Sequence, residues 1–567
     1  MQQVHTPLVT NRAQLLQRLA DKKTYDIAII GGGATGLGIA LDAALRGFSV
    51  VVLESHDFAK GTSSRATKLV HGGVRYLAQG NISLVREALH ERTTLLHNAP
   101  HIAQPLPFVM PSYKFWEAPF YGVGLKMYDA LAGKAGLGTT EFLNASQTLH
   151  CLPTLQKAGL KGGVKYWDGQ FDDARLALAL ARSAAKEGAL LVNYCKATKL
   201  IHEAGKLVGL TCQDQETNKK FNIAASCVIN ATGVWVDALR KQDQDGGAVK
   251  DIVAPSQGVH VVVDREFMPT DHAMLVPKTA DGRVLFAVPW LGKTILGTTD
   301  TPRGDLAREP EPFKEELDFI LNESAHYLSK APTRADVKSI WVGLRPLVKP
   351  SDDEGENTKK LSREHTVLVS KSGLVTVTGG KWTTYRAMAE DVLEQCFESD
   401  LLQRRPAAVT VDFPLVGAQH AGKKHEKMHS LGEAQGLHSY GDEADFVASM
   451  QGSSQELMPG LTEGMVRFAA RYEYARTVED VLARRSRLLF LDAEKAGKLG
   501  AAIAKILQDE TSHDPQLADF LGFKTYAAQV RAMNPSEAQL LIRSVFTNLQ
   551  DNAAATKNPF VDLPDTA

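Results

Sequence analysis

Residues 25–54 read YDIAIIGGGATGLGIALDAALRGFSVVVLE, and this stretch decides the fold. An apolar β-branched run, a glycine turn, an apolar helical segment with an alanine-rich face and a second apolar run follow one another, as in a βαβ unit. Gly31, Gly33 and Gly36 fill a G-x-G-x-x-G pattern. In that pattern the first glycine permits a tight turn, the second lets a pyrophosphate approach the backbone, and the third lets helix and strand pack closely.

An acidic residue ends the second apolar run. Glu54 lies near the spacing of about 20 residues at which a carboxylate binds ribose hydroxyls in such units. The positive end of the helix would face the phosphates. The stretch therefore predicts an adenine dinucleotide site. The glycines by themselves do not separate FAD from NAD, and the alternative is a glycine-rich turn that binds nothing.

Length and composition limit the other possibilities. A chain of 567 residues is too long for one core, so two or three domains are expected. The apolar content of 44% and the charged content of 23% are ordinary for a globular enzyme. A net charge of −1 provides no global attraction to nucleic acid or to an anionic membrane. The five cysteines include no C-x-x-C pair, which favours reduced thiols in a cytoplasmic compartment, and no metal site is predicted.

The sequence predicts neither a secretory leader nor a membrane-spanning helix. Residues 1–24 carry several cations but no apolar segment, and we expect a short lead-in helix with Leu15, Leu16 and Leu19 on one side. No run of about 18 apolar residues occurs. Any contact with a membrane is therefore expected to be peripheral.

A polar segment follows Glu54, where an NAD enzyme would carry another short βα unit. Thr62, Ser63 and Ser64 can offer hydroxyl and amide donors to a pyrophosphate, and the glycines after His71 allow close approach to a planar ring. A plain surface loop is the alternative, but loops of this length without a function are uncommon. Residues 61–77, GTSSRATKLVHGGVRYL, resemble the signature of the FAD-dependent glycerol-3-phosphate dehydrogenases, within the glycine/D-amino-acid-oxidase-like flavoprotein class.

Four later motifs extend this resemblance over roughly residues 20–530. They are NATG at 230–233, GTTD at 297–300, GLRPL at 343–347 and GGKWTTYR at 379–386. In the last motif Trp382 replaces an apolar residue of the family pattern, which is a minor departure. The resemblance implies an α/β fold with a two-part FAD-binding Rossmann-like domain, a substrate cap domain built on an antiparallel sheet, and a C-terminal all-α domain.

The expected domain boundaries follow from these motifs and from the local patterns. We expect an N-terminal helix in 1–24, an FAD-binding domain from 25–98, 163–250 and 366–398, a substrate cap domain from 99–162 and 251–365, a junction at 399–430, a helical domain at 431–550 and a disordered tail at 551–567.

The resemblance implies oxidation of sn-glycerol 3-phosphate at C2 to dihydroxyacetone phosphate, with hydride transfer to flavin N5 and delivery of the electrons to a membrane quinone. Together with the motifs it implies the following FAD-binding residues: Gly31, Gly32, Gly33, Ala34, Thr35, Gly36, Glu54, Thr62, Ser63, Ser64, Lys68, Leu69, His71, Gly72, Gly73, Ala231, Thr232, Gly233, Gly380, Lys381, Thr383 and Thr384.

This chemistry needs cations for the phosphate, an acceptor for the C2 hydroxyl proton, and positive potential near the reduced flavin. We expect Arg345 and Arg75 to bind the substrate with Tyr76 beside them, and Lys381 to lie near flavin and substrate. Arg363 is a further substrate-binding candidate. Any of these cations could instead be a structural ion-pair residue.

His260 is the candidate base, and a structural histidine in an alternating strand is the equal alternative. His71 is expected in the cofactor shell rather than as the base. Arg75, His260, Arg345 and Lys381 are thus the predicted catalytic set.

Two clusters favour a structural role. The aromatic residues between 108 and 121 are expected in the core rather than in contact with lipid or quinone. Arg484, Arg485 and Arg487 are expected on a solvated or salt-bridged surface rather than at a membrane.

Several readings of function stay open. A glycerol-3-phosphate oxidase that uses O₂ shares the first half-reaction, and an amine or amino-acid oxidase of the same class could also use Arg345. A flavin-containing nucleic-acid-binding protein is disfavoured by the net charge of −1. We expect a cytoplasmic protein, peripheral on the cytoplasmic face of the inner membrane, and the resemblance is compatible with a homodimer.

Overall fold

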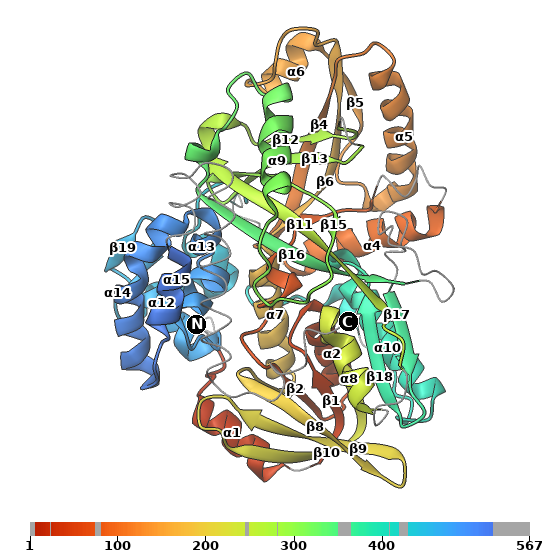
Figure 1. Cartoon of the computed structure of the whole chain (residues 1–567), viewed down its shortest axis with the longest axis vertical. Coiled ribbons are helices and arrows are strands. Elements are labelled where there is room, and N and C mark those ends of the chain that lie inside the picture. Colours follow the sequence, from red (N-terminus) through yellow and green to blue (C-terminus); the bar gives the residue numbers. More distant parts are fainter. Residues whose placement is uncertain are drawn as a thin grey trace, which may run out of the picture.

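The computed structural model describes residues 6–22, 24–73, 81–243, 249–279, 282–349, 365–407, 409–418 and 429–524. These residues form two large sheets with their helices and a separate group of C-terminal helices (Figure 1). In Figure 1 the first sheet occupies the lower part, the second sheet the upper part, and the C-terminal helices in blue flank both. The predicted fold class is confirmed.

The first sheet has eight strands, and its central path runs β17-β18-β10-β1-β2-β7, with β8 and β9 joined to it through β10. Its parallel centre consists of β1, β2, β10 and β18 with β7. The strand bounds are β1 (Thr24–Ile30), β2 (Val50–Leu53), β7 (Leu190–Val192), β8 (Cys195–Glu203), β9 (Lys206–Asp214), β10 (Lys220–Asn230), β17 (His365–Val369) and β18 (Leu374–Gly379).

The predicted βαβ unit is present as β1, α2 (Ala34–Leu45) and β2. A β-carbon at Gly36 would lie 2.0 Å from the carbonyl oxygen of Gly31, so only glycine permits this approach of helix and strand. Helix α2 packs between α7 (Asp173–Lys186) and α10 (Tyr385–Glu398). The carboxylate of Asp172 caps α7 by accepting the Arg175 N–H. The lead-in helix is α1 (Arg12–Asp21), with Leu15 and Leu19 buried.

The second sheet has ten strands, ordered β15-β11-β14-β13-β12-β4-β6-β3, with β16 paired to β11 and β5 to β6. The antiparallel sheet expected for the cap domain is confirmed by the pairs β11–β14, β12–β13 and β13–β14. The strand bounds are β3 (Leu69–Val70), β4 (Ala103–Ser112), β5 (Glu141–Asn144), β6 (Gly162–Phe171), β11 (Val253–Asp264), β12 (Ala273–Val276), β13 (Leu285–Trp290), β14 (Lys293–Gly297), β15 (Thr301–Pro302) and β16 (Ser339–Val348).

Helices α4 (Ile82–Asn98), α5 (Glu117–Ala132), α6 (Ala145–Cys151) and α9 (Lys314–Tyr327) accompany this sheet. The core prediction for the aromatic cluster is correct for Phe108, which is buried in β4. It is wrong for Phe115, Trp116 and Phe120, whose exposed fractions are 85%, 46% and 66%. Helix α5 buries Leu125 and other residues of one face, and its Val123 and Met127 are exposed together with Phe120.

The C-terminal group is helical over most of 431–524, as predicted, with a short hairpin of β19 (Glu456–Met458) and β20 (Leu461–Thr462). Thr477 and Asp480 cap one helix start, because the Asp480 carboxylate accepts the Thr477 N–H at 2.9 Å and the Asp480 N–H donates to Thr477 Oγ1 at 3.2 Å. The helices are α11 (Ala444–Ala448), α12 (Glu463–Tyr472), a π-helical turn (Asp480–Arg485), α13 (Leu488–Leu491), α14 (Ala493–Thr511) and α15 (Leu517–Lys524).

The arginines of this group are not at the surface. Arg484, Arg485 and Arg487 are all buried, and each is ion-paired to an aspartate of the first sheet's domain. The predicted surface location is therefore wrong, although the predicted salt bridges are present. The reason is that the partners, Asp57 and Asp173, lie far away in the sequence and no local pattern reveals them.

Parts of the predicted domain layout lie outside the described residues. They include residues 408 and 419–428 of the predicted junction, residues 525–550 of the predicted helical domain and the tail at 551–567, and the exact domain boundaries remain predictions. Among the described residues, no helix has both the length and the apolarity needed to cross a bilayer.

Candidate functional site

The candidate site begins at one edge of the first sheet. Strands β1, β2, β10 and β18 run parallel, so their carboxyl ends meet at the same edge. The glycine turn follows β1, Glu54 follows β2, the NATG motif ends β10 and the GGK motif ends β18. Ligands of open α/β sheets bind outside the carboxyl ends of the strands. Four motifs that are distant in sequence therefore converge where a nucleotide would bind.

The glycine turn has the geometry of a nucleotide cradle. Gly31 has φ +111°, and a β-carbon there would lie 2.5 Å from the carbonyl oxygen of Ala231. Gly33 is the N-cap of α2 and supplies no side chain, so the positive helix end faces this edge. The Gly32 N–H donates to Glu54 Oε2 at 2.7 Å, which holds the carboxylate beside the turn.

The polar segment after Glu54 folds back over the turn. Ser63 Oγ accepts the Ala34 N–H at 2.9 Å, at the first turn of α2. Thr62 instead donates its hydroxyl to the Leu344 carbonyl of β16 at 2.6 Å, while Ser64 is buried. Ser63 is therefore the hydroxyl nearest the helix end, whereas Thr62 connects the turn to the second sheet.

The GGKWTTYR motif closes the same site from the other side. Trp382 Nε1 donates to the Ser63 carbonyl at 2.9 Å, and Thr383 Oγ1 donates to the His71 carbonyl at 3.5 Å. Thr378 Oγ1 donates to the carbonyl of Gly233 at 3.2 Å. The amino-terminal, central and carboxy-terminal motifs thus contact one another directly.

Lys68 and Leu69 contribute to this region in a different way from the other predicted residues. The Lys68 ammonium lies 2.7 Å from both the Ser64 carbonyl and the Asp173 carboxylate, and Leu69 is buried in β3. Burial, with a further contribution from Arg487, lowers the pKa of Lys68 to about 7 against the opposing effect of Asp173. Any cofactor contact of Lys68 would therefore come from its backbone.

The second sheet brings a cation toward this edge. Arg345 on β16 contacts the Thr299 carbonyl at 2.9 Å, Thr298 Oγ1 at 3.4 Å and Asp300 at 3.4 Å. A β-carbon at Gly258 would lie 2.3 Å from its guanidinium, so this glycine makes room for Arg345. The GTTD motif thus orients the arginine of the GLRPL motif, a relation that the sequence did not predict.

His260 lies on β11, beside β16, and is buried. Its ring stacks on Trp341 with centroids 5.1 Å apart, and Nε2 is 2.8 Å from Thr67 Oγ1. Burial first, and then the charges of Lys68 and Arg345, hold the pKa of His260 well below its ordinary value. The imidazole is therefore neutral near pH 7.

Of the remaining predicted residues, Lys381 follows β18 at the carboxyl edge, and its ammonium nitrogen is buried there. Arg75, Tyr76 and Arg363 lie outside the described residues.

The sequence analysis did not single out Trp341, which stacks on His260, or Asp173, which forms an ion pair with Lys68. The sequence does contain a signal for Asp173. Two adjacent aspartates stand at the helix start, one is enough for the N-cap, and the other therefore needs a different partner.

Comparison with known proteins decides the family. The profile described as "FAD dependent oxidoreductase" matches residues 26–386, and the profile described as "C-terminal domain of alpha-glycerophosphate oxidase" matches residues 408–518. The mitochondrial glycerol-3-phosphate dehydrogenase of Rattus norvegicus is 42% identical over 535 residues, covering 88% of this chain and 72% of that protein. The chain belongs to the FAD-dependent glycerol-3-phosphate dehydrogenase family.

Solved structures agree with this family assignment. The glycerol-3-phosphate dehydrogenase of Bacillus halodurans, complexed with FAD, is 30% identical with a TM-score of 0.71, covering 92% of this chain and 97% of that one. The L-α-glycerophosphate oxidase of Mycoplasma pneumoniae, at 16% identity and a TM-score of 0.52 over 72% of this chain and 98% of that one, shares the fold alone. FAD is the cofactor of this family member. The glycine turn with Glu54 beside it, at the N-terminus of α2 where Gly33 supplies no side chain, fits its adenosine diphosphate part.

We expect Gly33→Ala to weaken FAD binding without unfolding the protein. The φ of Gly33 is −87°, and an added β-carbon would meet only Ser63 Oγ at 3.1 Å, which can rotate away. The methyl group would nevertheless occupy the path of a phosphate toward the backbone. FAD titration of the apoprotein should show affinity reduced at least about tenfold, or about 1.4 kcal/mol.

Gly124→Ala is the matched control for this change, because a β-carbon there meets nothing within 4 Å in α5. Both variants should keep the thermal midpoint of the wild-type apoprotein. Unchanged FAD affinity in Gly33→Ala would show that the phosphates bind elsewhere.

Proposed function

We propose that the chain oxidises sn-glycerol 3-phosphate at C2 to dihydroxyacetone phosphate and passes the electrons to a membrane quinone. FAD, when bound, supplies the hydride acceptor at N5. The observation that carries the proposal is the convergence of the nucleotide edge with Arg345 and His260 of the second sheet, in a chain of this family. The named activity of the rat and Bacillus halodurans relatives supports the same reaction.

Arg345 is the proposed phosphate-binding residue. Its guanidinium presents a planar fork suited to a phosphate, and the Thr299 carbonyl with Asp300 holds it in one orientation. Lys381 supplies a second positive charge at the nucleotide edge, and Arg75, Tyr76 and Arg363 remain predicted substrate contacts outside the described residues. The buried ammonium of Lys381 would also stabilise negative charge that develops on the reduced ring.

His260 is the proposed base for the C2 hydroxyl proton. A general base must be unprotonated at the working pH, and the lowered pKa of His260 meets this condition. Thr67 contacts Nε2, so the hydroxyl of this threonine can fix the ring tautomer. His71 is half-buried and remains a predicted residue of the cofactor shell, and a structural histidine is the alternative role for His260.

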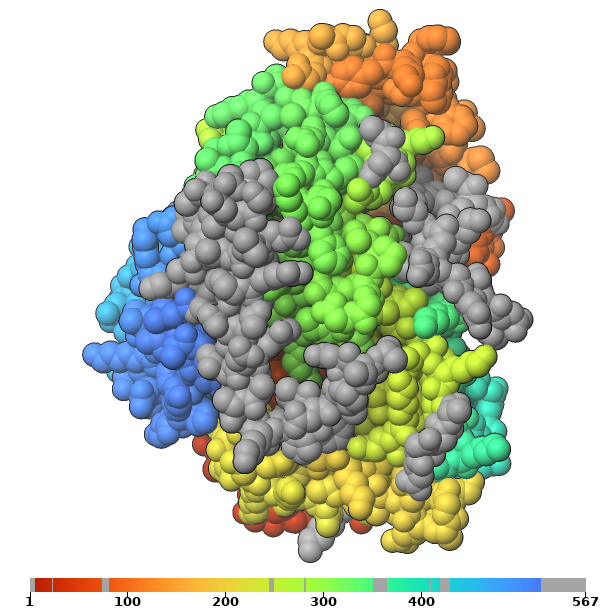
Figure 2. All heavy atoms as spheres, in the orientation of Figure 1, coloured from red at the N-terminus to blue at the C-terminus, as the bar shows by residue number. Residues whose placement is uncertain are grey.

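The proposed membrane contact is the outer face of α5. Phe120 and Val123 of α5 are exposed, as is Phe115 just before the helix. Lys114 lies over the ring of Trp116, and Lys126 lies over the ring of Phe142 in the neighbouring β5. Aromatic side chains with adjacent cations suit a lipid–water interface. The orange surface at the top of Figure 2 contains this region, at the end of the molecule away from the C-terminal helices. The rat relative is named as a mitochondrial protein. For this chain a cytoplasmic location and a homodimer remain predictions.

The acceptor can be tested with the intact flavoprotein. Anaerobic glycerol 3-phosphate should bleach the bound flavin, and quinone in lipid vesicles should restore its colour faster than air does. Phe120→Ser should slow reoxidation by vesicle quinone and leave reoxidation by a soluble quinone analogue unchanged. Fast reoxidation by air with stoichiometric H₂O₂ would assign the chain as an oxidase, and no bleaching would refute the proposed substrate.

Arg345→Ala should raise KM for glycerol 3-phosphate far more than KM for unphosphorylated glycerol. The loss of a charged contact to the phosphate is worth about 1.5–3 kcal/mol, which corresponds to about 10- to 150-fold. Arg334→Ala, which removes an ion pair with Asp318 in the same domain, is the control and should change neither KM. Equal effects on both substrates would exclude Arg345 from phosphate binding.

His260→Ala should slow flavin reduction at saturating substrate by about 10²- to 10⁴-fold. Because the pKa of His260 lies well below 6.5, the wild-type rate should stay level from pH 8 to pH 6.5 and fall only at more acidic pH. Stopped-flow absorbance measures both, with His272→Ala in the same sheet domain as the control. If His260→Ala reduces flavin at the wild-type rate and His71→Ala reduces it slowly, then His71 and not His260 is the base.

A further inference from the structure

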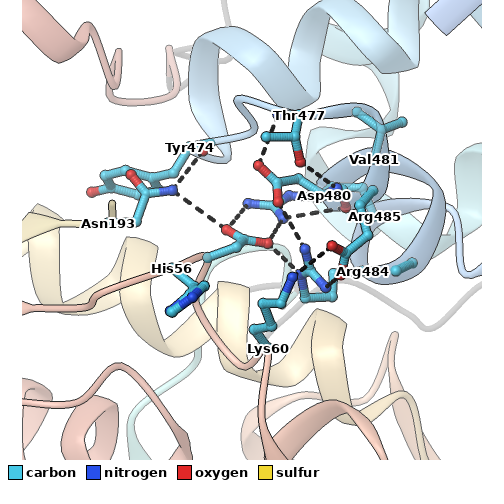
Figure 3. A network of polar contacts seen from close by, with 12 residues as sticks. His56, Lys60, Asn193, Tyr474, Thr477, Asp480, Val481, Arg484 and Arg485 are labelled. Atoms are coloured by element: carbon cyan, nitrogen blue, oxygen red, sulfur yellow. Dashed lines mark hydrogen bonds and ion pairs between the residues drawn. The ribbon is translucent and has the colours of Figure 1, made fainter. Parts of the chain in front are cut away.

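The C-terminal helices contact the first sheet's domain through a buried ionic network. Its centre is Asp57, which has no exposed surface and lies just after Glu54 in the chain. Arg484 Nε and Arg485 Nη1 both contact Asp57 Oδ2, and Arg485 Nη2 lies 3.0 Å from Oδ1. Figure 3 shows how Arg484 and Arg485 of the blue domain point toward the segment that carries His56 and Lys60.

The charges of this network balance. Besides Asp57 it contains two acids, Glu479 and Asp480, which Arg484 contacts at 2.8 and 2.7 Å. Lys60 provides the third cation, with its ammonium 2.6 Å from Glu479. Burial would raise the pKa of Asp57, but Arg485 and Arg484 overcome that effect and hold it below its ordinary value. The carboxylate therefore stays charged and stays paired.

A second contact joins the same domains a few residues further on. Arg487 donates to the Ser64 carbonyl at 2.9 Å and to Asp173 Oδ1 at 3.0 Å. The Lys68 ammonium binds the same two groups. Arg487 and Lys68 both have left-handed backbones, with φ +58° and +66°. Such conformations persist in residues other than glycine only where the surroundings hold them.

The two contacts enclose residues 57–68, which we call the nucleotide segment. Between them lie Thr62 and Ser63, and Ser63 meets the first turn of α2 through its hydroxyl and Trp382 through its carbonyl. The carbonyl of Ser64, which Arg487 holds, is the next one along the chain. The position of Ser63 at the cofactor edge therefore depends on both ends of this segment.

We propose that the C-terminal helical domain is a clamp for the cofactor, in which Arg484, Arg485 and Arg487 position the nucleotide segment for FAD binding. Arg487 is a positioning residue: it contacts Ser64 and Asp173, and acts on FAD through the segment. This inference rests on the FAD placement given above, not on the identity of the substrate or the electron acceptor.

A clamp of this kind has a thermodynamic consequence. If the ordered C-terminal domain raises the affinity for FAD, then bound FAD must stabilise the ordered C-terminal domain by the same factor. Amide protons of the π-helical turn and α13 should therefore exchange more slowly when FAD binds, although these elements contribute no predicted FAD-binding residue. A domain that merely packs beside the site would gain only the protection that bound FAD gives to every amide that exchanges through global unfolding.

The first experiment compares FAD affinity among three variants of the full chain. Arg487→Met should weaken FAD binding about tenfold or more, measured by quenching of FAD fluorescence on titration of the apoprotein. Arg487→Lys keeps the charge and should restore most of the affinity. Arg471→Met, in the same domain, removes a guanidinium that contacts Glu510 and should bind FAD as the wild type does.

Thermal unfolding of each apoprotein separates positioning from general stability. Asp173 keeps its Lys68 partner in Arg487→Met, so a folded apoprotein is expected. A lower thermal midpoint with wild-type FAD affinity would overturn the proposal, and so would equal losses of affinity in Arg487→Met and Arg471→Met.

The second experiment needs no substitution and covers the case in which Arg487→Met does not fold. Hydrogen exchange of the wild-type apoprotein is compared with and without FAD. A larger slowing at residues 478–491 than in α14 of the same domain supports the clamp. Slowing that is equal in these two segments, or confined to the nucleotide edge, overturns it. Flavin bleaching by glycerol 3-phosphate is measured separately, so failure of the proposed reaction and failure of the clamp can be distinguished.

Discussion

The buried negative charge of Asp57, and its pairing with two arginines, constrains how the C-terminal helices join the first sheet's domain. Asp57 has no contact with water, and two arginines from a domain more than 400 positions later in the chain neutralise it. Removing one partner of a buried pair typically costs about 3–5 kcal/mol, because the remaining charge is left uncompensated in a medium that solvates it poorly. The C-terminal helices and the first sheet's domain are therefore expected to keep one relative position.

The nucleotide segment, residues 57–68, also contacts β16 of the second sheet. Thr62 bonds to the Leu344 carbonyl of β16, and Trp341 donates to the Arg65 carbonyl at 3.3 Å. A β-carbon at Gly343 would lie 2.6 Å from that carbonyl, so the strand can approach only because this residue is glycine. Arg345 follows two residues later on the same strand. The distance between the nucleotide edge and the proposed phosphate-binding residue is thus set by side-chain-to-carbonyl hydrogen bonds and by the close approach at Gly343.

Local sequence patterns predict secondary structure and helix caps, whereas the burial of a side chain depends on tertiary contacts. The βαβ unit, the start of α7 and the antiparallel strands of the second sheet were predictable, because periodicity, glycine spacing and helix caps act over a few residues. The burial of Arg487 and the exposure of Phe120 were not, because each depends on which element, if any, covers the side chain. Arginines three apart resemble a solvated helix face until their aspartate partners are known.

The sequence by itself determined the nucleotide turn, the fold class and the family, since these depend on residues whose spacing along the chain carries the geometry. Only the tertiary structure decided that His260 is buried, stacked and neutral, that Asp300 and Thr299 orient Arg345, and that the C-terminal domain reaches the nucleotide segment. The physical reason is that pKa values and ion pairs depend on distances in space. Residues hundreds of positions apart set those distances, and no local pattern records them.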